Sequence, residues 1–150
     1  MDTTIFTVQT GGQFAVADLT AQVSRWVHER GDGLCHLLAL HATAGLGLME
    51  TGSGSEQDAQ TIVDRLMPAD DQIYRHGHGS PGHGRDHILP LFISPSLTIP
   101  VVAGELVLGT WQSLVLVDPN VDNHQRRVHA SFVISQGEGE RQRAGGRGSQ

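Results

Sequence analysis

The sequence contains no lysine: all ten of its basic residues are arginine. Mechanisms that need a lysine amine, such as Schiff-base formation, are therefore excluded, and any cationic side chain that binds an anion has to be an arginine. The single cysteine, Cys35, excludes an intrachain disulfide and a cysteine-rich zinc site. Because it lies in an apolar run, we interpret Cys35 as a small buried side chain rather than a nucleophile.

Positive charge and long apolar runs are also scarce. The net charge of the 150 residues is −6 with histidine neutral, which disfavours a nucleic-acid partner because phosphate binding needs a basic surface. No apolar run approaches the roughly 18 residues of a membrane span, and the N-terminus has no signal-peptide pattern. We therefore expect a folded, soluble, cytoplasmic protein without a membrane partner.

Apolar periodicity predicts helices in the first half of the chain and a cluster of strands in the second. Helical spacing occurs at residues 19–27 and 59–66, the second after a capping-box pattern at Ser55 and before Pro68. A tight hairpin is predicted at Ala103-Gly104. Strand patterns fall at residues 4–9, 14–16, 34–40, 46–50, 88–93, 97–102, 105–108, 110–117 and 127–134.

This segregation of helices from strands predicts an α+β fold: a mostly antiparallel sheet or sandwich with two helices. We expect one domain over residues 1–135. Residues 136–150, rich in glycine and arginine, are predicted to be a disordered tail.

The segment YRHGHGSPGHGRDHI, residues 74–88, holds four of the nine histidines among glycines. Imidazole is a common zinc ligand, yet this spacing fits no closed structural zinc pattern. We expect His87 to serve a site, fixed by the predicted strand after it, and His76 to be the second candidate. His78 and His83 are predicted to face solvent, in a mobile glycine-rich flap over residues 77–84.

Other polar groups fall at predicted strand ends, and each has two readings. His41 begins HATAG after an apolar strand and is either a ligand or general base, or a hydrogen-bonded structural histidine. Glu50 is either a metal ligand or base, or an exposed loop residue. The Arg126-Arg127 pair either binds an anion or has no binding role and only lies at the start of a strand. Trp111 and Gln112 either bind a phosphate or heterocycle, or belong to an ordinary turn; the role of His129 stays open.

Several segments together carry a resemblance to a known family. They are LHATAGLGLME at 40–50, YRH at 74–76, DHI at 86–88, SPSLTIPVVAGELVLGTWQSLVLVD at 94–118 and RRVHA at 126–130. In this order they resemble the YjbQ-type family, often labelled secondary thiamine-phosphate synthase, over roughly residues 4–135. The GTWQ segment in its apolar context is the most specific part.

The resemblance implies a compact α+β chain that assembles as a homotrimer, with a polar site near the subunit boundary. It implies a metal, zinc being plausible, held by His41, His76 and His87, with Glu50 as general base or fourth ligand and His41 also catalytic. Three imidazoles and a carboxylate suit zinc, and catalysis would need an open coordination position. The implied substrate contacts are Thr43, Trp111, Gln112, Arg126 and Arg127.

The family label implies joining a pyrimidine diphosphate to a thiazole phosphate with release of pyrophosphate. This sequence departs from the usual pattern in four places, having Met49 for Asn, Arg85 for Asp, Leu89 for Lys and Asp118 for Glu. It also has no dedicated acidic cluster for Mg²⁺. We therefore expect a metal-assisted enzyme for a small phosphorylated substrate, nominally thiamine-phosphate synthase. The alternatives are a non-catalytic trimer that binds a metabolite or metal, and a structural trimer without a ligand.

Overall fold

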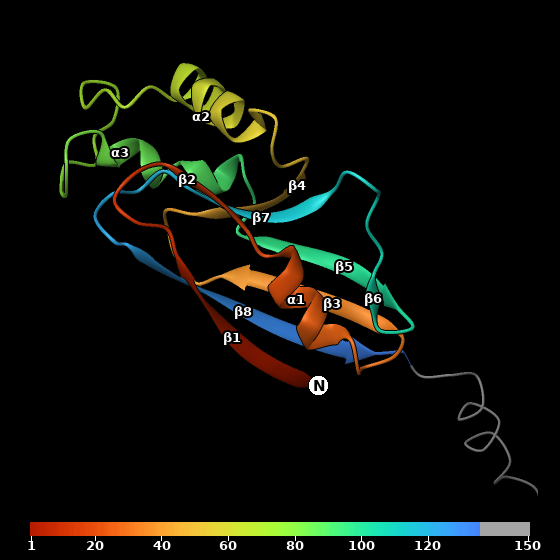
Figure 1. Cartoon of the computed structure of the whole chain (residues 1–150). Helices are drawn as coiled ribbons and strands as arrows, with labels where there is room; N and C mark the ends of the chain where they lie inside the picture. The colour runs from red at the N-terminus through yellow and green to blue at the C-terminus, as the bar shows by residue number, and fades with distance from the viewer. Residues whose placement is uncertain (136–150) are drawn as a thin grey trace, which may run out of the picture.

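The structure is a computed structural model that describes residues 1–135 (Figure 1); the tail predicted for residues 136–150 lies outside the described residues. In chain order the elements are β1 (Asp2–Gln9), β2 (Ala15–Asp18), α1 (Thr20–Val27), β3 (Gly33–Ala39), β4 (Gly45–Met49), α2 (Ser55–Leu66), α3 (His83–Asp86), the 3-10 helix η1 (Leu89–Leu91), β5 (Ser96–Val102), β6 (Glu105–Leu106), β7 (Ser113–Asp118) and β8 (Gln125–Ile134).

The larger sheet has five strands in the order β1-β8-β3-β5-β6, and every pairing is antiparallel. Alternate residues of its strands point to one buried face, as the period of two requires. The buried side chains of this face include Phe6, Cys35, Leu37, Ile99 and Phe132. The predicted burial of Cys35 is thus confirmed.

The smaller sheet has three antiparallel strands in the order β2-β7-β4. Its central strand β7 is buried on both faces, from Leu114 to Asp118. One face meets the core of the larger sheet through Leu114 and Leu116. Figure 1 shows α2, α3 and η1 gathered on the other side of this sheet, so the molecule is layered as helices, small sheet and large sheet.

Helix α1 closes the core between the two sheets. Val23 and Val27, one turn apart, are fully buried, which confirms the predicted apolar stripe. Trp26 stands edge-on to Phe6 and to Phe132, with ring centroids 6.0 and 6.5 Å apart. Each such pair adds about 0.5–1.5 kcal/mol beyond burial, so α1 is fixed on the large sheet by its aromatic contact.

Helix α2 begins differently from the prediction. Its N-cap is Gly54 in the left-handed region, at φ 97°, with no side-chain cap, and Ser55 is the first helical residue. The capping box is therefore wrong. The helix does end before Pro68 as predicted, and it buries Val63 beside Met67 and Leu89 in a second small core.

The strand predicted over residues 88–93 is wrong: this segment is the helical turn η1 with Pro90 near its start. Proline has no N–H to give to a sheet, and only Leu89 of its apolar residues is fully buried, whereas Leu91 and Phe92 are exposed. The strand at 105–108 is shorter than predicted, and β7 starts at Ser113 rather than at residue 110.

The predicted α+β class and mostly antiparallel sheets are confirmed, although residues 1–135 contain two short helical segments, α3 and η1, beyond the two predicted helices. The predicted hairpin at Ala103-Gly104 joins β5 to β6, with both residues at positive φ. Within the same described range, no helix is long and apolar enough to cross a membrane.

Candidate metal centre

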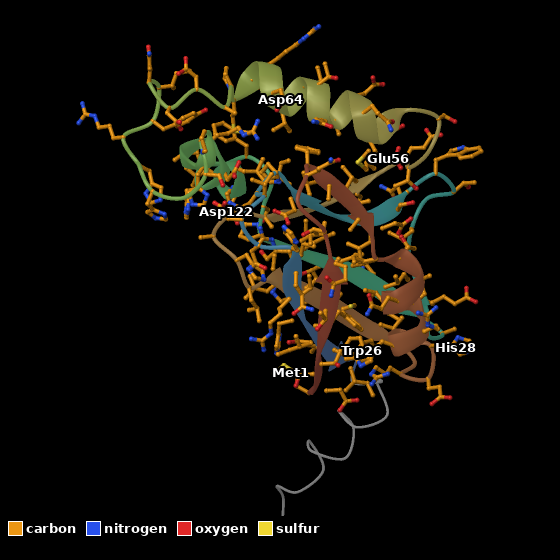
Figure 2. All side chains as sticks on the ribbon, turned by 60° about the vertical axis from the view of Figure 1, so that its left-hand side comes forward. Met1, Trp26, His28, Glu56, Asp64 and Asp122 are labelled. Atoms are coloured by element: carbon orange, nitrogen blue, oxygen red, sulfur yellow. The ribbon has the colours of Figure 1, made fainter. Side chains whose placement is uncertain are left out.

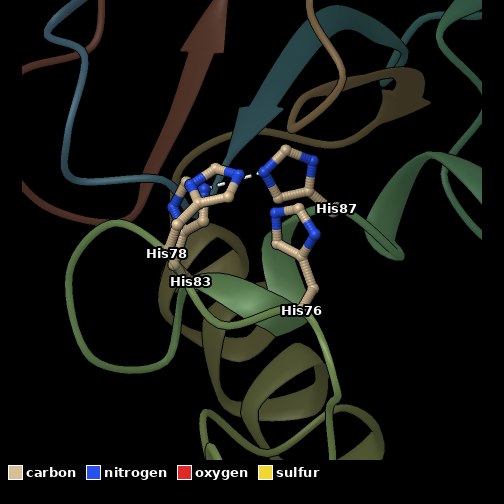
Figure 3. A group of neighbouring side chains, drawn as sticks. All are labelled: His76, His78, His83 and His87. Carbon is tan, nitrogen blue, oxygen red and sulfur yellow. Dashed lines mark hydrogen bonds between the residues drawn. The ribbon is translucent and has the colours of Figure 1, made fainter.

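Four imidazole rings converge beside α3. His76, His78, His83 and His87 each offer a ring nitrogen, and these four atoms lie within 4.8 Å of one another (Figure 3). The Nε2 atoms of His83 and His87 are 2.7 Å apart. His76 packs against His78 and His87 with ring centroids 4.2 Å away in each case. The pair predicted to serve a site, His76 and His87, is thus joined by two further histidines.

Local backbone geometry explains how one short segment brings four rings together. Gly82, at φ 85°, starts α3 in the left-handed region, and the four-residue spacing of His83 and His87 places them on one face of the turn. A Cβ on Gly84 would lie 2.6 Å from Tyr74 Cβ and 3.0 Å from His76 O. Glycine here lets the chain before His76 pass directly against α3.

The histidine segment is tied down on two sides. Figure 2 shows Asp64 on α2 and Asp122 beside α3. Asp64 Oδ1 accepts a 2.5 Å hydrogen bond from Arg85, and Asp122 accepts hydrogen bonds from both the N–H and the hydroxyl of Ser80. These contacts hold the chain at Ser80, before His83, and at Arg85, within α3. The mobility predicted for residues 77–84 stays a prediction.

His83 is buried, with 9% of its surface exposed, whereas His78 is exposed. The prediction of solvent exposure is therefore wrong for His83 and confirmed for His78. The reason is a polar pocket around the His83 ring. Its Nδ1 lies 2.9 Å from Asn120 Nδ2 and 3.0 Å from Asp122 Oδ2, both in the β7–β8 loop.

Asn120 extends this pocket into a buried network. Its side-chain amide also donates to Asp86 at 3.1 Å, and its oxygen accepts from Arg126 at 3.1 Å. Arg126 in turn makes two hydrogen bonds to Asp118, at 2.7 and 3.0 Å. The histidine cluster is thereby connected to a buried ion pair between the two sheets.

The surroundings of His87 favour its uncharged imidazole. Burial lowers the pKa of His87, and the neighbouring His76 and His83 lower it further because a second positive charge there would be repelled. Burial raises the pKa of the Asp86 carboxyl, against its bonds to Arg85 and Asn120. A neutral imidazole has a free lone pair, which is the form that binds a metal.

The four-ring group does not include the other predicted metal and catalytic residues, His41 and Glu50. His41 follows β3, and its Nε2 accepts a 2.8 Å hydrogen bond from Arg127 N; burial, followed by the charge of Arg126, lowers its pKa. Glu50 is exposed just beyond β4. Their predicted roles as ligand and base stay predictions, and the ring convergence involves neither.

The predicted substrate contacts are spread over the molecule. Arg126 is only 2% exposed and already pairs with Asp118, so its guanidinium is not presented to an anion. Trp111 is 73% exposed, Gln112 accepts a hydrogen bond from Gly109 N, and Thr43 is buried. The roles predicted for these residues in substrate binding stay predictions.

Sequence reasoning missed His83 as a member of the group, together with its partners Asn120 and Asp122. One signal was present: His83 and His87 are four residues apart, the spacing that aligns side chains on a helical turn. Nothing local pointed to Asn120, which follows His83 by 37 positions.

Comparison with known proteins places the chain in a family. The family profile described as "UPF0047 protein YjbQ-like" matches residues 4–135. A UPF0047 protein of Mycobacterium tuberculosis is 50% identical over 133 residues, covering 89% of this chain and 98% of that protein. The YjbQ protein of Salmonella typhimurium is 33% identical over 101 residues, covering 67% of this chain and 72% of that protein.

Solved structures agree with the fold. A hypothetical protein from Aeropyrum pernix superimposes with a TM-score of 0.81 at 28% identity, covering 90% of this chain and all of that one. A YbjQ-like protein of unknown function from Sulfolobus solfataricus gives a TM-score of 0.78 at 23% identity, covering 89% and 97%. At this lower identity the second likeness concerns the fold alone.

Proposed function

We propose that this chain, which belongs to the UPF0047 family of YjbQ-like proteins, binds a divalent transition-metal ion through its clustered histidines and acts on a small phosphorylated molecule. The observation that carries the metal proposal is the convergence of four imidazole nitrogens within 4.8 Å. Protonated imidazoles would repel one another at this separation, whereas one metal ion would satisfy the lone pairs of four neutral rings at once.

The donor set supports zinc or a similar metal over magnesium or calcium. Imidazole nitrogen suits Zn²⁺, Cu²⁺ and Ni²⁺, whereas Mg²⁺ and Ca²⁺ take oxygen ligands. Zinc bonds imidazole at about 2.0–2.1 Å in a tetrahedron, so ligand nitrogens lie about 3.3 Å apart. The 2.7 Å between His83 and His87 needs only a small opening to reach that separation.

Enzymatic activity would require an open coordination position. His78 is the ligand suited to leave one, because it is exposed and stands between Gly77 and Gly79. A bound metal would supply Lewis acidity toward a phosphate oxygen. The phosphorylated substrate class, with thiamine-phosphate synthesis as the nominal reaction, rests on the family resemblance.

A second candidate is a non-catalytic metal-binding protein. Four protein ligands complete a tetrahedral shell, which is the usual ligand number of a structural zinc site. In this alternative His78 stays bound, and Glu50→Gln changes nothing measurable. In the enzymatic proposal Glu50→Gln abolishes turnover while leaving the fold intact.

We also propose a homotrimer that uses the outer face of the five-stranded sheet. Large apolar side chains are exposed on that face, on strands β1, β3, β5 and β8: Ile5, Leu34, Leu38, Val102 and Val133. A groove of about 430 Å³ near Leu34 and Val133 lies at one end of it. Contiguous exposed apolar surface is typical of a subunit interface. Light scattering would show the mass of three chains, and Leu34→Asp would lower it.

The deciding experiment is elemental analysis of the tag-free protein after saturation with Zn²⁺ and gel filtration. We expect about one metal per chain, a sharp loss in His87→Ala and no change in His28→Ala, an exposed histidine far from the cluster (Figure 2). Absence of metal in the unsubstituted protein would refute the proposal. Pyrophosphate release from a pyrimidine diphosphate and a thiazole phosphate would then be measured with the loaded protein.

A further inference from the structure

The Nδ1 atom of His83 faces one hydrogen-bond donor and one hydrogen-bond acceptor. At 2.9 Å lies Asn120 Nδ2, an amide nitrogen that only donates hydrogen bonds; at 3.0 Å lies Asp122 Oδ2, a carboxylate oxygen that only accepts them. In a neutral imidazole, Nδ1 either carries the proton or offers the lone pair. Each tautomer of His83 therefore satisfies one neighbour and leaves the other facing a mismatched atom.

The opposite ring nitrogen decides which tautomer suits which state. Nε2 of His83 points at Nε2 of His87, on the side where the four rings converge. In the tautomer with its proton on Nε2, His83 donates a hydrogen bond to His87, and Nδ1 accepts one from Asn120. With a metal on Nε2, that atom gives its lone pair, so the ring proton has to lie on Nδ1 and is donated to Asp122.

We propose that Asp122 is the positioning residue of the metal centre: it accepts the Nδ1 proton of His83 and so selects the tautomer whose Nε2 binds the metal. The inference rests on the proposed metal function. Asn120 holds the other tautomer. When the partner of Nδ1 changes from Asn120 to Asp122, the ring proton of His83 moves from Nε2 to Nδ1. This change requires no movement of the backbone.

Asp122 is held ready for this role. Its carboxylate accepts hydrogen bonds from Ser80 N, at 3.1 Å, and from the Ser80 hydroxyl. Its own backbone N–H donates to Asn120 Oδ1 at 3.0 Å. Both partners of His83 thus come from one short loop, at a spacing that the loop itself fixes. Carboxylate partners of metal-binding histidines orient the ring and raise its basicity, and their loss typically costs about 10–100-fold in metal affinity.

The test is Zn²⁺ affinity, measured by competition with a chelating dye, in Asp122→Ala and two matched controls. Ser80→Ala removes a hydrogen bond of the same clamp but keeps the carboxylate. Asp71→Asn weakens another tether of the same segment, at Gly82 N. We expect Asp122→Ala to weaken zinc binding by about 10–100-fold and both controls to stay within about threefold of the unsubstituted chain.

A tautomer readout separates positioning from mere support. In ¹⁵N NMR of the metal-free proteins, the tautomer of His83 with its proton on Nδ1 should be populated in the unsubstituted chain and in Ser80→Ala, and depleted in Asp122→Ala, where Asn120 is the remaining partner of Nδ1. If Asp122→Ala does not fold, Asp122→Asn replaces it, with an intermediate loss expected because a neutral oxygen accepts more weakly. Unchanged affinity in these variants would overturn this inference alone, whereas failure of the unsubstituted chain to bind zinc would overturn the metal function and this inference with it.

Discussion

The Nε2 atoms of His83 and His87 face each other at 2.7 Å, a separation at which two charged rings would repel each other. Such a pair is satisfied when one ring donates its N–H to the lone pair of the other, or when both turn their lone pairs toward one cation. Two rings more, His76 and His78, stand at the same point. A cation that takes the place of the proton shared by His83 and His87 should therefore change the hydrogen bonding of the whole cluster.

Zinc should stabilise the folded protein. A ligand that binds only the native state at 100 times its Kd adds about 2.7 kcal/mol to the free energy of unfolding. Differential scanning fluorimetry after chelation, and again after adding Zn²⁺, should show a rise in Tm that a chelator reverses. The double variant His83→Ala, His87→Ala should show no rise; an equal rise there would place the metal elsewhere.

Asp118→Ala should destabilise the fold strongly, by about 3–5 kcal/mol, because it leaves the buried guanidinium of Arg126 without its charge partner. Urea denaturation gives the free energy of unfolding. The matched control is Asp2→Ala, which removes the mostly exposed partner of Arg30 and should cost at most about 1 kcal/mol. A similar small loss at both positions would contradict the importance of the buried pair.

Two glycines of β4 should respond differently to alanine. A Cβ on Gly45 would lie 2.3 Å from Ile93 O, whereas a Cβ on Gly47 meets nothing within 4 Å. Forcing a methyl group into a packed site typically costs about 1–3 kcal/mol, so Gly45→Ala should lower stability by about that amount and Gly47→Ala should be nearly neutral. Equal urea denaturation midpoints for the two variants would show that β4 moves to accommodate the methyl group at residue 45 without loss of stability.

Cys35 should be unreactive in the native state. Burial raises the pKa of its thiol from 9.0 to about 11, against a small opposing effect of Arg30. Iodoacetamide at pH 8 should therefore label the native protein at least about 100-fold more slowly than the urea-unfolded chain, since two pKa units change the thiolate fraction by that factor. Rapid labelling without denaturant would contradict this burial.

The raised pKa of the Cys35 thiol also determines how the free energy of unfolding changes with pH. Between pH 9 and about 11 the native thiol keeps its proton while the unfolded thiol loses it, so the native state binds more protons. The contribution of Cys35 to stability is therefore complete below pH 9 and decreases as the pH rises toward 11. Cys35→Ala should flatten this part of the stability curve measured by urea denaturation.

Much of the fold could be predicted from local pattern because its elements are amphipathic in the ordinary way. Val23 and Val27 recur at helical spacing, and Cys35 and Leu37 alternate with exposed neighbours along β3. The wrong prediction at residues 88–93 has a local cause as well: Pro90 has no N–H to donate to a sheet ladder, and the apolar side chains around it are largely exposed.

The histidine site was only half predictable. His76 and His87 were selected from their neighbours in sequence, whereas the burial of His83 depends on Asn120 and Asp122, which the β7–β8 loop brings from a distant part of the chain. A glycine-rich segment looks flexible when read alone. Its tethers to Asp64 and Asp122 are tertiary contacts that no window of sequence contains.

The buried pair of Asp118 and Arg126 joins the end of a strand in the small sheet to the start of one in the large sheet. Asn120 bonds this pair and His83 at once. Relative displacement of the two sheets is therefore transmitted to an imidazole ring. For the proposed metal centre, zinc affinity should therefore depend on the packing between the two sheets. Leu116→Ala, which removes a core side chain, should change the zinc affinity measured by titration.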